Sequence, residues 1–323
     1  MENLFLAWNE FKRGKTKKID VQQFEFKLED NIFNLHKELK NKTYRHSDYT
    51  SFNVCDPKLR KIHKAVVKDR VLHHAIFRIL YPIFDKNFIL DSYSCRIDKG
   101  VHIGVKRFEE FSRKASKNNK KKIFTLKCDI KKFFDSIDQE ILLKLIKRKI
   151  RDENAIWLTE RIIHSFPKGL PLGNVISQLF ANIYLNELDQ FAKHILKEKY
   201  YLRYCDDFII MAEDKKHLEK LIGKLGDFLQ NELKLNLHPN KIIIRKYRQG
   251  IDFLGYVVLP HHRVLRTKTK RRMMKKLSLN HKILKEGLIS EEEFNQSLQA
   301  YLGVLKHCDG RGIEKKISRI IKK

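Results

Sequence analysis

The segment at residues 200–211, YYLRYCDDFIIM, places two acidic residues at the centre of an otherwise apolar run. Its apolar halves predict two short β-strands, and Cys205-Asp206-Asp207 predicts the tight turn that joins them into a hairpin. Aspartate is a common turn residue, so an Asp-Asp pair in a turn carries little information by itself. The pair gains meaning only if another carboxylate lies beside it in the fold.

Asp129 is the candidate for that neighbour. It lies near the end of the apolar segment 123–130, IFTLKCDI, which predicts another strand. If this strand lies beside the hairpin, Asp129, Asp206 and Asp207 converge at one edge of a sheet and their charges repel. Two Mg²⁺ ions about 3.5–4 Å apart would compensate the repulsion, and such a pair serves phosphoryl transfer at a 3′-hydroxyl. The carboxylates therefore predict a two-metal site.

The charge of the whole chain indicates a matching substrate. Its 323 residues include 68 Lys and Arg against 39 Asp and Glu, a formal net charge of +29, and 42% are hydrophobic, which suffices for a folded core. This surplus is typical of proteins that bind a polyanion, and a generic basic protein with a solvated charged face is the simpler alternative. We see no secretory signal and no apolar run of about 18 residues, so we expect no membrane partner. Scattered cysteines favour reduced thiols in a cytoplasm.

Helical and strand patterns alternate around these segments. An N-terminal helix is expected where Phe24, Leu28, Ile32 and Leu35 recur at a spacing of three to four. Further helices are expected over 70–84, 139–149, 154–166, 175–197 and 215–232, and strands over 242–246 and 253–258. The part from residue 262 onward is expected to be helical and very basic. This order favours an α+β fold, an antiparallel sheet backed by helices.

At the carboxylates the sequence resembles the reverse transcriptases. KCDIKKFFDSID (127–138) is similar to their motif A, GLPLGNVISQLFANIYLNELD (169–189) to motif B and RYCDDFII (203–210) to motif C. KLNLHPNK (234–241) and DFLGYVV (252–258) resemble motifs D and E, and DSYSCRIDKG (91–100) resembles an upstream finger motif. The resemblance implies a right-hand polymerase. Fingers would span 1–121, the palm 122–260 with finger helices inserted near 139–168, and a helical basic thumb 261–323.

Motif B narrows the resemblance to one group. Group II intron and retroviral-type enzymes usually carry Gln-Gly at its start and Ser-Pro at its end, whereas this chain has Leu172-Gly173 and Ser177-Gln178. That departure is typical of the reverse transcriptases of diversity-generating retroelements. Segment 300–310, AYLGVLKHCDG, is also similar to the thumb of that group.

The resemblance implies roles for individual residues. Asp129 and Asp206 would bind both Mg²⁺ ions, for which Mn²⁺ is an alternative, with the backbone carbonyl of Ile130 as a further ligand and Asp207 as the adjacent carboxylate. Phe134 takes the steric-gate position, where a ring excludes the 2′-hydroxyl of an rNTP; without the motif, core packing would explain it. The remaining implied contacts are Lys58, Arg60 or Arg70 on the triphosphate, Lys241 as general acid for pyrophosphate, Leu172, Gly173 and Gln178 at the nascent pair, Phe253, Leu254 and Gly255 as primer grip, and Lys268, Arg271, Arg272, Lys275 and Lys276 on duplex phosphates.

Leu172 carries a prediction about accuracy. A Gln at this position can hydrogen-bond near the base and sugar of the nascent pair, and Leu cannot. One lost polar contact is worth about 1–3 kcal/mol of discrimination. We therefore expect tolerance of mispairs, above all opposite template adenine.

The function that the sequence favours is an RNA-directed DNA polymerase, copying RNA into cDNA in an error-prone, diversity-generating retroelement. Its partners would be an RNA template and RNA/DNA duplex, dNTPs, a small oligomeric accessory protein and structured retroelement RNA. It would act in the cytoplasm of a bacterial or phage-infected cell. Two alternatives are another bacterial reverse transcriptase, defence-associated or a truncated group II intron enzyme, and a non-catalytic RNA-binding protein on a polymerase scaffold.

Overall fold

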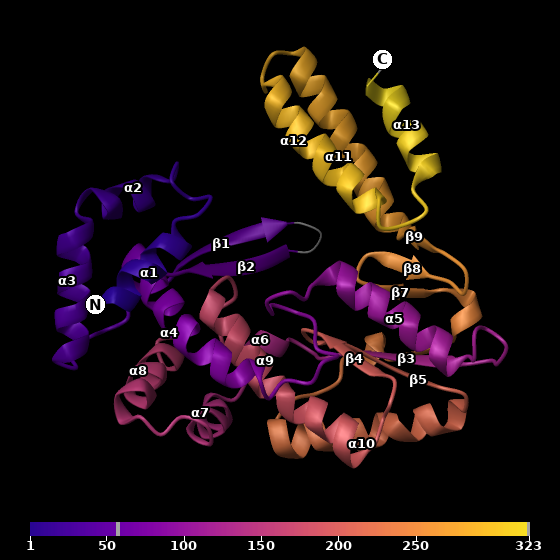
Figure 1. Ribbon diagram of the computed structural model, residues 1–323, viewed down its shortest axis with the longest axis horizontal. Helices are drawn as coiled ribbons and strands as arrows, with labels where there is room; N and C mark the ends of the chain where they lie inside the picture. The colour runs from indigo at the N-terminus through magenta and orange to yellow at the C-terminus, as the bar shows by residue number, and fades with distance from the viewer. Residues whose placement is uncertain (56–58, 322–323) are drawn as a thin grey trace.

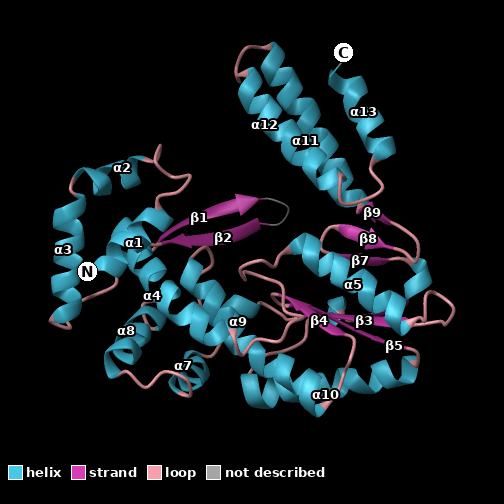
Figure 2. Ribbon diagram, in the orientation of Figure 1, coloured by secondary structure: helices cyan, strands magenta, loops and turns pink. Residues whose placement is uncertain are grey.

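The computed structural model describes residues 1–55 and 59–321. They form a helical N-terminal region, a central sheet covered by helices, and a C-terminal group of helices that stands apart from the sheet (Figure 1). Figure 2 shows helices and strands mixed along the chain, which confirms the expected α+β class. Among the described helices, none is both long and apolar enough to cross a membrane.

The central sheet carries the acidic hairpin. It consists of β4 (Tyr201–Tyr204), β5 (Asp207–Ala212), β3 (Phe124–Asp129) and β6 (Ile243–Lys246), in this spatial order and all antiparallel. Apolar side chains alternate along the strands, so both faces of the sheet are buried. Leu126 and Cys128 belong to one core cluster, whereas Ile209 and Met211 belong to another on the opposite face. The predicted strand and hairpin are therefore confirmed.

Helices cover both faces of this sheet and fill the connection from β3 to β4. On one face lie α9 (Val175–Gln190) and α10 (Lys215–Leu233), and on the other lies α5 (Val101–Ala115) (Figure 1). The β3–β4 connection contains α6 (Phe133–Ser136), α7 (Gln139–Lys147) and α8 (Glu153–Ile163). The expected helix over 175–197 is too long, because the α-helix ends at Gln190 and continues as a π-helical turn, Phe191–Ile195.

The N-terminal region combines helices with one hairpin. The chain begins with three helices, α1 (Glu2–Phe11), α2 (Ile19–Phe26) and α3 (Leu28–Lys40). The hairpin strands β1 (Thr50–Cys55) and β2 (Leu59–Lys64) follow, and then helix α4 (Val67–Asp85). The expected apolar stripe is divided between α2 and α3, because Lys27 leaves the helical conformation with φ −120° and ψ 43°. Ile32 and Leu35 form its fully buried part.

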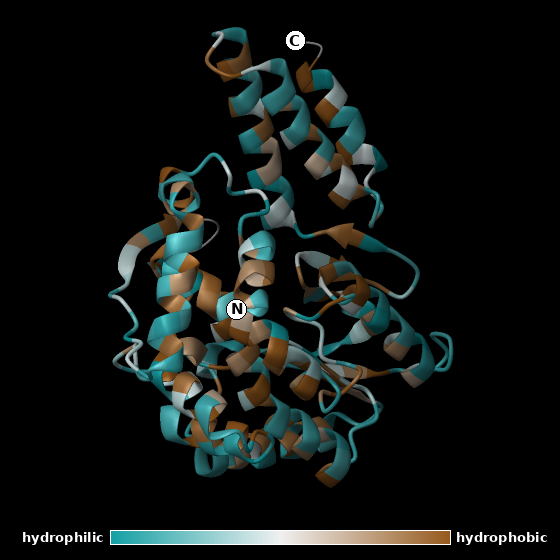
Figure 3. Ribbon diagram, turned by 60° about the vertical axis from the view of Figure 1, so that its left-hand side comes forward, coloured by the Kyte–Doolittle hydropathy of each residue, from teal (hydrophilic) through white to brown (hydrophobic). Residues whose placement is uncertain are grey.

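The C-terminal part begins with a small antiparallel sheet of β7 (Ile251–Phe253), β8 (Tyr256–Val258) and β9 (Arg263–Leu265). The expectation of a single strand over 253–258 is wrong. Leu254 and Gly255 both have positive φ, 49° and 90°, and form the turn between β7 and β8. Three helices follow, α11 (Thr267–Lys285), α12 (Glu291–Leu305) and α13 (Arg311–Ile321), in which hydrophilic positions predominate around a few buried apolar ones (Figure 3).

Candidate active site

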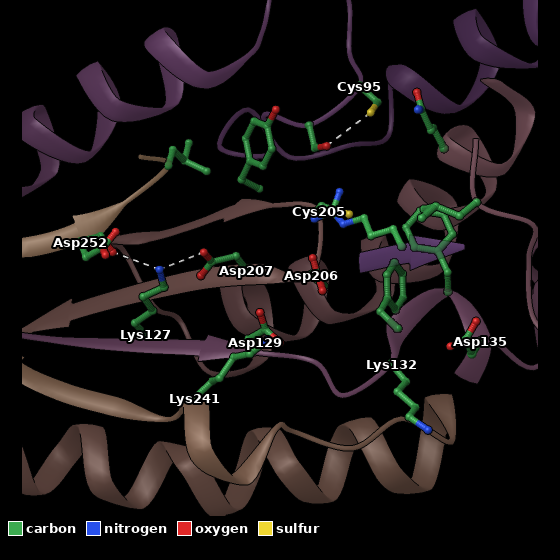
Figure 4. Close-up of a pocket in the computed structure, with 18 of the residues that line it drawn as sticks. Cys95, Lys127, Asp129, Lys132, Asp135, Cys205, Asp206, Asp207, Lys241 and Asp252 are labelled. Atoms are coloured by element: carbon green, nitrogen blue, oxygen red, sulfur yellow. Dashed lines mark hydrogen bonds and ion pairs between the residues drawn. The ribbon is translucent and has the colours of Figure 1, made fainter. Parts of the chain in front are cut away.

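A cleft of about 1180 Å³ opens over the end of the central sheet. Side chains from β2, from α6 and from the loop before α9 line it, together with side chains from the β4–β5 turn of the central sheet and from the β7–β8 hairpin. Asp129, Asp206 and Asp207 all lie in this lining (Figure 4). The chain thus brings its expected carboxylates into one large concave space.

Strand register explains why the carboxylates meet. Asp129 ends β3 directly opposite Asp207, the first residue of β5, and Asp206 lies in the turn just before it. Cys205 takes a positive φ of 55° in this turn. In Figure 4, Asp129 and Asp206 face the same space, whereas Asp207 is turned toward Lys127.

Two lysines compensate part of this negative charge. The Lys241 ammonium donates to Oδ1 of Asp129 at 2.5 Å, and the Lys127 ammonium lies 3.0 Å from Oδ2 of Asp207. Burial still raises the pKa of Asp206, and the neighbouring charge of Asp129 raises it further. Burial also raises the pKa of Asp207 to about 6, although Lys127 acts in the opposite direction. The site therefore remains short of positive charge.

The donor set at this position fits a hard divalent cation. Among the described residues, no three His, Cys, Asp or Glu side chains are grouped closely enough to hold a metal unaided. Mg²⁺, however, is usually held by one or two carboxylates together with substrate phosphates and water, and Asp129 and Asp206 supply that pair. Ile130 and Leu237 form an isolated β-bridge. Its two hydrogen bonds use the carbonyl of Asp129 and the N–H of Lys131, so the carbonyl of Ile130 takes no part in them.

The loop at residues 169–174 forms a wall of the cleft. Leu170 N–H donates to the carbonyl of Phe134 at 2.8 Å, and a Cβ on Gly169 would lie 2.3 Å from that same oxygen. Only glycine permits this approach. Half-buried Leu172 and exposed Gln178 also line the cleft, together with the Phe134 ring. The structure thus brings these three predicted residues to one place.

Comparisons with known proteins identify this arrangement. Residues 40–258, more than half of the chain, match the family described as reverse transcriptase (RNA-dependent DNA polymerase). The chain belongs to the reverse transcriptase family.

Individual relatives extend this assignment. Protein YkfC of Escherichia coli (strain K12) is 25% identical over 267 residues, which are 68% of this chain and 67% of that protein. The group II intron-encoded protein LtrA of Lactococcus lactis is 25% identical over 329 residues, covering 78% of this chain and 53% of LtrA. This reverse transcriptase chain therefore spans about half the length of LtrA.

Solved structures of telomerase share the fold. The apo telomerase of Candida tropicalis superposes with a TM-score of 0.53 and 15% identity, covering 85% of this chain and 59% of that one. The Candida albicans telomerase, in complex with a fragment of telomeric RNA, gives 0.52 and 13%, covering 88% and 58%. The fold is therefore that of a right-hand polymerase, as expected from the sequence.

The three candidates for the triphosphate lie in different environments. Arg60 lies on β2 and lines the cleft. Arg70 does not reach the cleft lining, because its guanidinium pairs with Asp20 at 2.5 Å and lies over the ring of Phe11. Lys58 lies outside the described residues. Lys58 and Arg60 were expected just before a helix, and Arg60 lies on strand β2, paired with β1, which precedes α4.

The expected primer grip and thumb contacts are placed as follows. Leu254 lines the cleft at the β7–β8 turn, whereas Phe253 is fully buried beneath it. On α11 the buried positions are Met273 and Leu277. The five predicted cations are exposed on the same helix, at Lys268, Arg271, Arg272, Lys275 and Lys276.

Sequence reasoning missed two residues that support the carboxylates. Lys127 touches Asp207 and also donates to the backbone carbonyl of Asp252 at 3.0 Å, which links the site to β7 (Figure 4). Lys127 lies two residues before Asp129 on β3, and alternate residues of a strand share one face, so the sequence could have placed it beside the carboxylates. Arg203 is fully buried behind the turn, and its presence inside an apolar strand was the corresponding signal.

We expect the substitution Lys127→Met to lower the rate of primer extension about 10–100-fold, the usual effect of losing a group that orients a metal-site carboxylate. Lys127→Arg should retain most of the rate, because it keeps a cation there. The matched control is Lys121→Met, since Lys121 forms an exposed ion pair with Glu213. A Lys127→Met rate equal to that of the control would contradict this role.

Proposed function

We propose that this chain is an RNA-directed DNA polymerase that copies an RNA template into cDNA by two-metal nucleotidyl transfer. The observation that carries the proposal is the juxtaposition of Asp129 and Asp206 at the floor of a large cleft in a right-hand polymerase fold. When bound, two Mg²⁺ ions would neutralise the triphosphate and lower the pKa of the primer 3′-hydroxyl. Asp129 and Asp206 would hold them, with the Ile130 carbonyl.

Other side chains of the cleft then have roles in the same reaction. Lys241 places its ammonium beside Asp129, a position from which a proton can reach leaving pyrophosphate. Arg60 offers a bidentate guanidinium for the triphosphate. The half-buried ring of Phe134 narrows the space for a 2′-hydroxyl and so favours dNTPs. Asp207, which forms an ion pair with Lys127, adds a third carboxylate next to the two that would hold the metal ions.

We assign three subdomains to this reaction. The fingers are residues 1–121, the palm is 122–260 with finger helices near 139–168, and the thumb is 261–323. The helices and hairpin of the N-terminal part, the central sheet, and the three C-terminal helices support this division. The exposed cations of α11 fit the phosphates of a template–primer duplex.

We further propose that the polymerase is error-prone at template adenines and serves a diversity-generating retroelement. Leu172 lines the cleft with no side-chain polar group to test the nascent pair, and Gln178 lines the same cleft. The net charge of +29 leaves cations for structured retroelement RNA or an accessory protein. All five cysteines are unpaired, which fits the cytoplasm of a bacterial or phage-infected cell.

Sequencing of cDNA copied from a defined RNA tests this proposal. We expect errors of the wild type to concentrate opposite adenine. Leu172→Gln should reduce them about 5- to 150-fold, because the restored polar contact supplies about 1–3 kcal/mol of discrimination. The control is Leu288→Gln, at a side chain that is 71% exposed in the C-terminal part. Identical error spectra for wild type and Leu172→Gln would show that Leu172 does not set accuracy.

The relatives favour one second candidate. LtrA is a group II intron-encoded protein, so another bacterial reverse transcriptase, without the mutagenic role, is the nearest alternative. Uniformly accurate copying of the defined RNA would support it. The three carboxylates at the cleft count against a purely RNA-binding role.

A further inference from the structure

Asn174 occupies the N-cap position of α9 and yet does not cap this helix. Asparagine is among the preferred N-cap residues because its side-chain oxygen accepts from the first free N–H groups. Here no such bond is formed, and within the described residues Oδ1 of Asn174 has no hydrogen-bond partner. Instead Nδ2 donates to the carbonyl of His63 on β2 at 3.0 Å. With 3% of its surface exposed, this side chain serves a contact between elements.

A second hydrogen bond joins the same two segments. His63 N–H donates to the carbonyl of Leu172 at 2.9 Å. Between these bonds Gly173 lies against Ile62, where an added Cβ would be 2.7 Å from Cγ2, and its φ of 112° also favours glycine. Strand β2 therefore contacts residues 172–174 through a backbone hydrogen bond, a side-chain hydrogen bond and close packing.

This contact connects parts of the cleft that are distant in the sequence. Arg60 lies three residues before His63 on β2, and Leu172 lies two before Asn174. At its other end the same loop holds the carbonyl of Phe134 through Leu170 N–H. Displacing β2 would thus move Arg60 and Leu172 relative to each other within the cleft that both line.

We propose that Asn174 is a positioning residue for the incoming nucleotide. By holding His63, its amide fixes the finger strand β2 against the loop that carries Leu172. The inference rests on the proposed polymerase function and adds to it a determinant of nucleotide binding. Asp and Ser cap helices about as well as Asn, but Asp cannot donate to the His63 carbonyl and Ser is too short to replace the amide reach. Both substitutions therefore remove the hydrogen bond to His63 while leaving a residue that can cap α9.

Steady-state primer extension with varied dNTP tests the proposal. We expect Asn174→Asp and Asn174→Ser to raise KM for dNTP about five- to tenfold, the effect of one lost hydrogen bond, with a smaller change in kcat. The melting temperature of Asn174→Ser should fall by at most a few degrees, because a hydroxyl that caps α9 offsets part of the lost hydrogen bond. Amide hydrogen exchange over β2 should accelerate in both variants while α9 stays protected. The control is Asn231→Asp, at an exposed position of α10.

Each outcome has a distinct meaning. Unchanged KM together with unchanged exchange over β2 would overturn the inference, as would a fall of the Asn174→Ser melting temperature by more than a few degrees with a fall in kcat alone. Raised KM and faster exchange, with the melting temperature of Asn174→Ser within a few degrees of that of the wild type, would support it. A wild type that extends no primer would instead contradict the polymerase function, and the exchange measurement would still decide whether Asn174 holds β2.

Discussion

Asp206→Asn is expected to abolish primer extension without unfolding the chain. The amide keeps the shape of the side chain but loses the charge that would hold a divalent cation opposite Asp129. Metal neutralisation of the transition state is worth several kcal/mol, so we expect a loss of about a thousandfold or more in rate.

Stability should change in the opposite direction. Burial and Asp129 raise the pKa of Asp206 in the fold. A carboxyl with a raised pKa destabilises the folded state at pH values above that pKa, where it is ionised. Without added metal, Asp206→Asn should therefore melt at the same temperature as the wild type or higher at pH 7.

Single-turnover extension and thermal melting, run on the same preparations, check both parts. Asp227→Asn is the control, because it makes the same chemical change at an exposed position of α10. An Asp206→Asn rate within tenfold of the control would show that Asp206 does not carry the chemistry. A lowered melting temperature would assign it a structural role.

The largest loss of stability is expected for Arg203→Met. The guanidinium and Asp189 are both fully buried, with Nε donating to Oδ1 at 2.7 Å and Nη2 to Oδ2 at 2.6 Å. Nη1 also donates to the carbonyl of Cys205, in the turn that carries Asp206. Removing the arginine leaves a buried carboxylate without its cation, which costs about 3–5 kcal/mol of unfolding free energy.

Urea denaturation measures this loss, with Arg148→Met as control. Arg148 pairs with Glu187 at 3.1 Å but is 54% exposed, so its loss should cost at most about 1 kcal/mol. The double variant Arg203→Met/Asp189→Leu should regain most of the stability, because it removes the unpaired charge. It should not regain full activity, since the Cys205 carbonyl still lacks its donor. An Arg203→Met stability equal to that of the control would refute this account.

Local patterns were sufficient for the acidic hairpin and its neighbour. Alternating apolar residues on both sides of Asp206-Asp207 specify strands, and Asp129 at the end of another apolar strand specifies which edge of the sheet becomes acidic. The fold class follows from the same order of helices and strands. Each strand depends on residues close together in the sequence, whereas the pairing that sets Asp129 opposite Asp207 joins distant residues and was predicted only on the condition that the strands are neighbours.

Features that depend on distant partners could not be predicted in this way. The ion pair of Arg70 with Asp20 joins residues far apart in the chain, so the sequence alone left Arg70 as a candidate for the triphosphate. The segment at 253–258 reads as one apolar strand, and only the antiparallel pairing of Phe253 with Tyr256 and a positive φ at Leu254, rare for leucine, divide it. The Asn174–His63 contact likewise arises only when the hairpin meets the loop.

Extension of a DNA primer on a defined RNA template, with dNTPs and Mg²⁺ at permissive salt, tests the central claim most directly. We predict that the wild type produces cDNA that reaches the end of the template, and that withholding the divalent cation stops synthesis. A wild type that binds the primer–template duplex under these conditions but adds no nucleotide would contradict the claim.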